Sequence, residues 1–226
     1  KAGGLLLLAW LLIYPSSGAL LARLSQPAGK LVFLAPAEAF IAQVQVSFWG
    51  AVLVALPYLL YQVWQFTAAG LFPTEQRAIV LILPAAYGLF LSGAVFAVGV
   101  VMPAMVKFFL AFASATLTPV LSVERYVSFA AGLMLSFGLS FQLPLILWVL
   151  ARAGIVSPAL LGTARRYVIV LIFIVAAALT PPDVVSQLLL ALPLCVLYEA
   201  GVWAARCAGS RRRAAPAPRE QTGRPA

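Results

Sequence analysis

Histidine is absent from this 226-residue sequence, and acidic side chains number only six. Histidine is the commonest general base and metal ligand near neutral pH, so its absence argues against hydrolytic and zinc-dependent sites. Two cysteines, Cys195 and Cys207, are too few for a disulfide framework or a metal cluster. We also find no glycine-rich phosphate loop and no Ser-His-Asp set. The sequence therefore predicts a protein that is not an enzyme and that uses no metal or cofactor.

Apolar residues are what the sequence has in abundance. Hydrophobic residues make up 64% of the chain and charged residues 9%, with a mean hydropathy of +1.04, whereas soluble domains carry about 25% charged residues. A membrane crossing needs about 20 mostly apolar residues. The predicted fold is an all-α, polytopic membrane domain with six transmembrane helices, at residues 3–22, 43–64, 78–102, 127–151, 167–180 and 184–203.

The fifth and sixth spans are predicted to form a short hairpin. The stretch "YVIVLIFIVAAAL" has thirteen residues, which is too few for a full crossing. The prolines of "TPPD" at 180–183 cannot continue a helix, and Asp183 suits the N-cap of the next one. Prolines also interrupt the other spans, which predicts kinked helices and a concave bundle.

The distribution of basic residues predicts that both termini are cytoplasmic. With that orientation, eleven of the fifteen Lys and Arg residues are inside, including Arg77, Arg152 and the six arginines after Trp203, as the positive-inside rule requires. Loops 24–41 and 102–125 are then outside, with enough apolar residues for interfacial helices. The membrane domain is predicted to cover residues 1–205. A basic tail at 206–226 should be disordered and should contact membrane lipids, with no nucleic-acid partner.

The first span has a second interpretation. Its stretch "KAGGLLLLAWLLIYPSSGA" begins with a basic residue, continues with an apolar core and ends in small residues, as a secretory signal does. The other five spans would keep their orientation if this segment were removed, so the charge distribution does not distinguish the two interpretations.

Polar side chains at membrane depth are informative because an unpaired one is costly in lipid. Gln142 is predicted near the middle of the fourth span, where it either bonds a neighbouring helix of the same bundle or docks a partner's transmembrane helix. Glu199, near the cytoplasmic end of the sixth span, is expected to reach the interface and pair with Arg206. Asp183 and Gln187 lie one turn apart at the other end of that span.

Three segments carry a resemblance to a known family. They are "LPYLLYQVWQFTAAGLFPTEQR", "FGLSFQLPLILWVLARAGIVSPALLGTARRYVIV" and "LTPPDVVSQLLLALPLCVLYEAGVW", and they resemble, in order and spacing, the signature segments of the TatC family, the receptor subunit of the twin-arginine protein translocase. The resemblance implies a six-span bundle in the bacterial cytoplasmic membrane that binds twin-arginine signal peptides of folded proteins. It further implies the single-span partners TatA and TatB and a homo-oligomer in the receptor complex.

The resemblance also assigns residues. Glu75 matches the family's glutamate that receives the arginine pair, and Phe66 and Arg77 flank it in the same motif. Asp183 and Gln187 match polar positions of the hairpin near which the family binds a TatB or TatA helix. Gln142 stands where many members have a glutamate, and a glutamine cannot carry a charge. The family's N-terminal segment with a pattern like "HLxELRxR" is not found, because this sequence starts inside the first span.

A carboxylate near the membrane surface can select arginine over lysine. Arginine donates two parallel N–H bonds to a carboxylate, a geometry that lysine cannot copy, and Glu75 is well placed for this. The competing interpretation is that Glu75 pairs locally with Arg77. For the whole chain, the alternatives are a small-molecule or ion secondary transporter and a scaffold that binds membrane helices without recognising a signal. Neither an inverted repeat nor a path of buried carboxylates is evident, as a transporter would favour.

Overall fold

Helices make up almost all of the described chain. The computed structural model describes residues 2–29, 31–68, 73–113, 120–180 and 183–213. Within these ranges there are six helical spans long and apolar enough to cross a membrane, at Gly3–Ala28, Glu38–Gln62, Ile82–Leu110, Val123–Ala153, Ala159–Ala178 and Val184–Cys207. The described residues contain no strand beyond an isolated bridge between Val32 and Ser122. The predicted all-α, six-span fold is confirmed.

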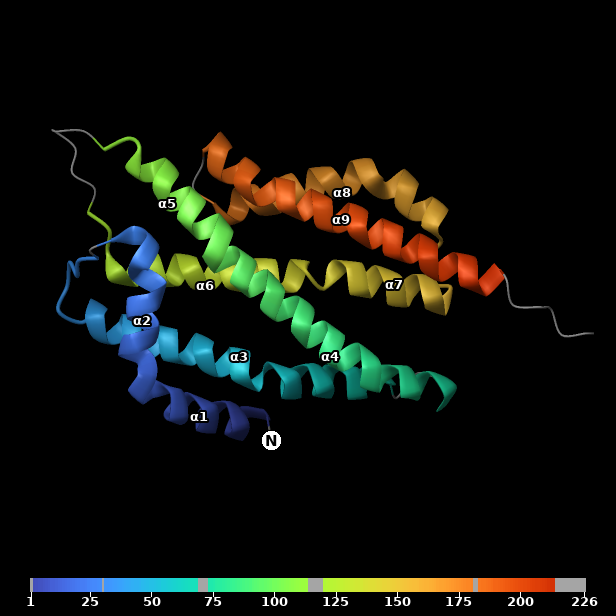
Figure 1. Ribbon diagram of the computed structural model, residues 1–226, viewed down its shortest axis with the longest axis horizontal. Coiled ribbons are helices and arrows are strands. Elements are labelled where there is room, and N and C mark those ends of the chain that lie inside the picture. Colours follow the sequence, from blue (N-terminus) through green and yellow to red (C-terminus); the bar gives the residue numbers. More distant parts are fainter. Residues whose placement is uncertain (1, 30, 69–72, 114–119, 181–182, 214–226) are drawn as a thin grey trace, which may run out of the picture.

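Several spans are built from more than one helical segment. The segments are α1 (Ala2–Ile13), η1 (Tyr14–Ser16), α2 (Ser17–Ser25), η2 (Gln26–Ala28), α3 (Glu38–Ala68), α4 (Pro73–Phe96), η3 (Ala97–Val101), α5 (Met102–Leu110), α6 (Val123–Ser140), α7 (Leu143–Ala153), α8 (Pro158–Leu179) and α9 (Val184–Arg213). In Figure 1, α3, the α6–α7 pair and the α8–α9 pair run roughly alongside one another, and α4 continues through α5 diagonally across α6.

The molecule has two opposite edges that matter for function. At one, which we call the α3–α4 edge, α3 and α7 end, α4 and α8 begin, and α9 ends (Figure 1). At the other, which we call the Val32–Ser122 edge, lie the connections from α2 to α3 and from α5 to α6 and the turn from α8 to α9. The predicted domain boundary at 205 falls inside α9, and residues 214–226 of the predicted tail lie outside the described residues.

Prolines interrupt the helices at three places. A proline leaves the carbonyl four residues earlier without its donor. Pro144 therefore coincides with the end of α6 at Ser140, Pro103 follows the π-helical turn η3, and Pro15 lies in the 3₁₀ turn η1. Other prolines, including Pro57 in α3, lie inside helices that continue through them. Some of the predicted kinks are thus complete breaks in the α-helical pattern.

The fifth span is longer than predicted. Helix α8 has 22 residues, Pro158–Leu179, and not the thirteen of its most apolar part. Ser157 caps it by accepting a hydrogen bond from the Leu160 N–H at 3.2 Å, and proline suits the first helical position. Arg165 lies inside this helix because arginine is a good helix former. The prediction of a short span was wrong because a charged residue ends an apolar run without ending a helix.

The predicted outer loops are shorter than expected. Helix α3 already begins at Glu38, and residues Met102–Leu110, predicted as part of an outer loop, continue the third span as α5. The connections that remain are joined to each other. The Val32 N–H donates to the Leu121 carbonyl at 3.0 Å, and the Val123 N–H donates to the Val32 carbonyl at 2.9 Å. These two bonds satisfy both backbone groups of Val32 outside the helices.

One carboxylate also holds these connections together. Glu38 Oε2 accepts from the Leu34 N–H at 3.0 Å and from the Ser122 hydroxyl at 3.1 Å. Sequence reasoning assigned Glu38 no role. The signal available was that it is one of only six acidic residues.

Helices α4 and α6 pack closely through glycines. A Cβ on Gly93 would lie 2.6 Å from the Phe137 carbonyl oxygen, and a Cβ on Gly138 would lie 2.6 Å from the Phe90 ring. Phe137 and Phe90 are both buried. Small residues at helix crossings let backbones approach and gain packing contacts, which drive helix association in membranes. Glycine is required at position 93 because a backbone carbonyl cannot move aside as a side chain can.

Gly93→Ala should therefore destabilise the isolated protein by about 1 to 3 kcal/mol, as overpacking does in other cores. Gly88→Ala on the same helix is the matched control, because a Cβ there meets nothing within 4 Å and alanine is the better helix former. Thermal unfolding in detergent measures both. Equal melting temperatures for the two variants would contradict the close approach of α4 and α6.

Candidate functional site

The residues predicted to bind a signal peptide lie on either side of the α3–α4 connection. Phe66 is in the last turn of α3, and Glu75 and Arg77 are in the first two turns of α4. The sequence predicted these two charged residues in a loop, whereas the helix already starts at Pro73. A carboxylate in the first turn is favoured by the helix dipole, which also leaves N–H groups unpaired there. The side chains of all three residues lie outside the described part of the structure.

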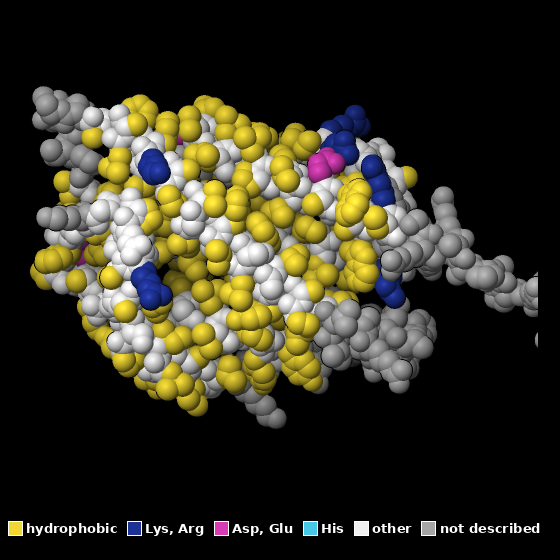
Figure 2. Space-filling view, viewed as in Figure 1, with side chains coloured by type: hydrophobic (Ala, Val, Ile, Leu, Met, Phe, Trp, Pro, Cys, Tyr) yellow, Lys and Arg dark blue, Asp and Glu magenta, His cyan; other side chains and the backbone are white. Residues whose placement is uncertain are grey.

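Basic side chains gather at this same edge. Figure 2 shows Lys and Arg side chains there beside an acidic one, with apolar surface across the middle of the molecule. Arg152 at the end of α7 lies over the Trp148 ring, 5.2 Å from its centroid, and Arg166 lies over the Tyr167 ring at 4.7 Å. Such pairs of arginine and an aromatic ring suit a membrane interface, where one side of the pair is apolar and the other is hydrated.

Glu199 pairs across helices and not along its own. Arg165 Nε on α8 lies 2.7 Å from Glu199 Oε1 on α9, and Arg165 Nη2 donates to Glu199 Oε2 at 2.8 Å. The predicted pairing with Arg206 is therefore wrong. Because α8 continues through Arg165, that arginine faces Glu199, midway along α9. Both side chains are nearly half exposed, so the pair is worth about 0 to 1 kcal/mol, and it orients Glu199 more than it stabilises the fold.

Gln142 lies between α6 and α7 and bonds inside the bundle. The break at Pro144 places it against α4, where its Nε2 donates to the Ala86 carbonyl at 2.9 Å, and the side chain is buried. This contact agrees with the sequence interpretation in which Gln142 bonds a neighbouring helix of the same bundle. The amide acts as a donor here, which an ionised glutamate at this position could not do. Docking of a partner helix at Gln142 stays a prediction.

Asp183 and Gln187 lie together at the Val32–Ser122 edge. Asp183 Oδ1 accepts from the Ser186 N–H at 2.7 Å, which confirms its predicted role as the cap of α9. Gln187 Nε2 donates to the Phe173 carbonyl of α8 at 3.1 Å. Two buried atoms of this group, Asp183 Oδ2 and Ser186 Oγ, have no hydrogen-bond partner among the described residues. Both oxygens at the α8–α9 turn could therefore accept a further hydrogen bond.

The predicted site residues thus form three separate groups. Glu75, Phe66 and Arg77 are at the α3–α4 edge, Asp183 and Gln187 are at the opposite edge, and Gln142 lies between them within the helix bundle. No group of three or more Cys, Asp or Glu residues that could hold a metal occurs in the described residues.

Comparison with known proteins decides the family. The family model described as "Sec-independent protein translocase protein (TatC)" matches residues 1–193. The chain belongs to the TatC family. The TatC protein of Carboxydothermus hydrogenoformans is 39% identical over 178 residues, covering 78% of this chain and 73% of that protein. The TatC protein of Aquifex aeolicus is 36% identical over 191 residues, covering 84% and 79%.

A solved structure agrees with the fold. A crystal structure described as "Twin Arginine Translocase Receptor- TatC" superposes with a TM-score of 0.81 at 33% identity, covering 92% of this chain and 94% of that one. The resemblance stated from the sequence is confirmed. The chain is a multi-pass membrane protein and a TatC component of a Sec-independent protein translocase. Nothing in these similarities supports the alternative of a small-molecule transporter.

The bond from Gln142 to Ala86 can be tested by substitution. Gln142→Leu should lower the stability of the isolated protein by about 0.6 to 2 kcal/mol, the range for hydrogen bonds between membrane helices. Gln142→Glu should be tolerated at pH 5 better than at pH 8, because only the protonated acid can donate to the carbonyl and that form is lost as the pH rises. Melting temperatures in detergent at both pH values measure these effects.

Gln43→Leu is the control for the loss of a glutamine, since the side chain of Gln43 on α3 makes no hydrogen bond with a described residue. If Gln142→Leu melts like the wild-type protein but co-purifies less with single-span partners, Gln142 serves docking and the internal bond is incidental.

Proposed function

We propose that this chain is the receptor and core subunit of a twin-arginine translocase, which recognises twin-arginine signal peptides and exports folded proteins without catalysing a reaction itself. The similarity to a solved receptor of this name over nearly the whole chain is the observation that carries the proposal. The family relatives are named as Sec-independent translocase proteins, which is consistent with this role.

Signal peptides are proposed to bind at the α3–α4 edge. Glu75 receives one arginine of the pair through two parallel charge-assisted bonds, with Phe66 and Arg77 alongside. Supporting this, Glu75 is the only acidic residue of the segment 65–81. Glu199, which also lies towards that edge in the described part of the chain, is already paired with Arg165. One such bond is worth about 1.5 to 3 kcal/mol. The apolar part of the signal must therefore add binding energy by lying against the helices.

The orientation proposed is that the α3–α4 edge faces the cytoplasm of a bacterial cell, with both termini cytoplasmic. The described arginines at that edge include Arg152, Arg165, Arg166 and Arg206, whereas the Val32–Ser122 edge has Arg23, Lys107 and Arg125. The last turn of α9 adds three more arginines, at positions 211–213, to this asymmetry.

TatA- and TatB-like single-span subunits are proposed as partners, with a homo-oligomer in the receptor complex. A partner helix that presents a hydrogen-bond donor would suit the α8–α9 turn, where Asp183 Oδ2 and Ser186 Oγ lack partners among the described residues. Gln187 lies beside them, and Gln142 is a further candidate contact. Buried polar atoms in a membrane interior are costly unless they are satisfied.

Recognition by Glu75 predicts a change in selectivity. Wild-type protein should bind a peptide with an arginine pair more tightly than the same peptide with a lysine pair, and Glu75→Gln should reduce that preference by about tenfold to a hundredfold. Dissociation constants of the purified chain for the two peptides provide the measurement. Glu199→Gln is the matched control at the same edge and should leave the preference intact. An unchanged preference in Glu75→Gln would show that the arginine pair is read elsewhere.

The orientation predicts accessibility to a membrane-impermeant thiol reagent. In a background in which Cys195 and Cys207 are replaced, a cysteine at Ala113, which follows α5 and is exposed, should be labelled in intact cells after removal of the outer membrane barrier. A cysteine at Thr163, which is exposed near the start of α8, should be labelled only after the membrane is opened. The reverse pattern would invert the topology.

A further inference from the structure

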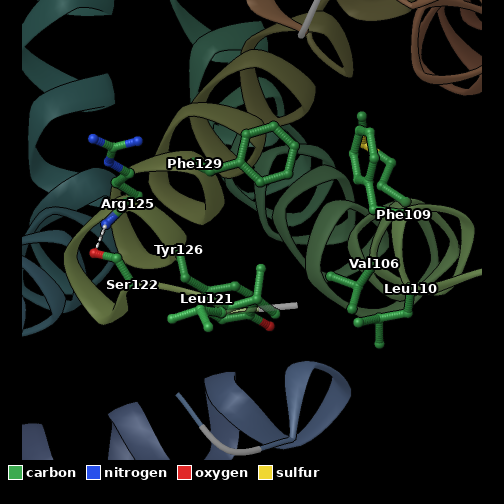
Figure 3. A pocket seen from close by; sticks show the side chains of 10 residues that line it. Val106, Phe109, Leu110, Leu121, Ser122, Arg125, Tyr126 and Phe129 are labelled. Carbon is green, nitrogen blue, oxygen red and sulfur yellow. Dashed lines mark hydrogen bonds between the residues drawn. The ribbon is translucent and has the colours of Figure 1, made fainter. Parts of the chain in front are cut away.

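A groove of about 270 Å³ opens between α5 and the start of α6, at the Val32–Ser122 edge. Apolar side chains form most of its lining, among them Val106, Phe109 and Leu110 on the α5 side and Leu121 and Phe129 on the α6 side. In Figure 3 the two sets face each other across the groove. None of these residues belongs to the signal-peptide or partner sites proposed above.

A single charged side chain, Arg125, lines the groove. It is exposed, and its guanidinium has no ion pair or hydrogen bond with any described residue. The other polar groups of the lining are already in use. The Ser122 hydroxyl donates to Glu38, and the Tyr126 hydroxyl donates to the Leu24 carbonyl at 2.8 Å. The group left to bind a ligand is therefore a cation that suits an anionic oxygen.

The groove crosses the boundary between hydrocarbon and headgroups. The third span ends at Leu110 and the fourth begins at Val123, so Arg125 stands two residues inside the end of its span, while Phe129 lies a further turn deeper. A long cationic side chain at this depth reaches towards the interface. The apolar floor stays among acyl chains. One end of the groove suits an anion and the other suits hydrocarbon.

The volume favours an occupant thinner than a helix. A helix with its side chains is about 10 to 12 Å wide, so a piece as long as the six residues Met105–Leu110, about 9 Å, fills on the order of 700 to 1,000 Å³. That is more than twice the volume of the groove, so the groove does not enclose the full width of a helix. Part of one extended acyl chain is much narrower, and the rest of the lipid can lie outside the groove, with its headgroup supplying the negative charge.

We propose that this groove binds one phospholipid of the leaflet at the Val32–Ser122 edge. Part of one of its two acyl chains lies between α5 and α6, against Phe109 and Phe129, and its phosphate pairs with the Arg125 guanidinium. Arginine forms two parallel bonds to phosphate oxygens, which explains why a cation stands at this rim without a protein partner among the described residues. A lipid held there fills the space between the third and fourth spans beside the bonded connections around Val32 and Ser122.

The test is lipid binding to the full purified chain in detergent, measured by native mass spectrometry. Three probes separate the parts of the ligand: dioleoyl phosphatidylglycerol, its headgroup glycerophosphoglycerol without chains, and dioleoylglycerol without phosphate. We expect phosphatidylglycerol to bind at least about tenfold more tightly than dioleoylglycerol, as a charge-assisted bond provides. The headgroup alone should not bind at the same concentrations. Binding of the headgroup alone would instead mean a free-anion site and would overturn the proposal.

Two variants and a control locate the binding. Arg125→Gln should lose at least about tenfold in affinity for phosphatidylglycerol, whereas Arg23→Gln, an exposed arginine in the last turn of α2 outside the lining, should not. Leu110→Trp fills the groove and keeps the charge, so it should reduce the binding of both chain-bearing lipids. Wild-type affinity in either groove variant would refute the site.

The identity of the occupant is tested in the membrane itself. A photoreactive benzoylphenylalanine at Phe109 should form crosslinks to phospholipid. Crosslinks to a second copy of the chain or to a single-span subunit in place of lipid would show that a protein covers this groove.

Discussion

A lipid environment requires that every backbone N–H and C=O group find its partner within the protein, and the architecture follows from this requirement. At two prolines the α-helical pattern gives way, with a π turn before Pro103 and a break before Pro144, whereas α3 continues through Pro57. The break at Pro144 also exposes Gln142 to α4, where its amide finds the Ala86 carbonyl. Where the chain must leave its helices, Val32 and Ser122 bring two connections together.

Polar interactions are consequently divided by depth. The middle of the bundle contains neutral contacts, such as Gln142 with α4 and the close glycine packing of α4 on α6, whereas the Arg165–Glu199 ion pair and the arginine–aromatic pairs lie towards the α3–α4 edge. This division is expected from the cost of a charge in hydrocarbon. At the α8–α9 turn, Asp183 Oδ2 and Ser186 Oγ are buried without a hydrogen-bond partner among the described residues. An unsatisfied buried oxygen is a place where a partner's donor gains the most.

Composition and apolar runs predicted the number, order and class of the helices, because the bilayer imposes a minimum length on any span. They did not predict where helices end. Residues Met102–Leu110 were predicted as part of an outer loop able to form an interfacial helix, yet a π turn lets the third span continue past Pro103. Helix α8 likewise passes through Arg165. The partner of Glu199 was missed because it depends on which residues of α8 and α9 face each other. The start of α8 was predicted nine residues too late, at 167 in place of Pro158, so Arg165 was not expected to lie in a helix beside α9.

Of the candidate sites, the cap at Asp183 was predictable because it is local, whereas the bond from Gln142 joins residues 56 positions apart and required the fold. Its chemistry limits how this chain can recognise a substrate. The amide at Gln142 is neutral, Glu38 lies in the first turn of α3, Asp183 caps α9 and Glu199 is paired with Arg165. The proposed recognition of an arginine pair therefore falls to Glu75 at the α3–α4 edge. In that proposal the helix bundle selects the hydrophobic part of a signal by shape and apolar contact, so this part and the arginine pair would be read by different parts of the molecule.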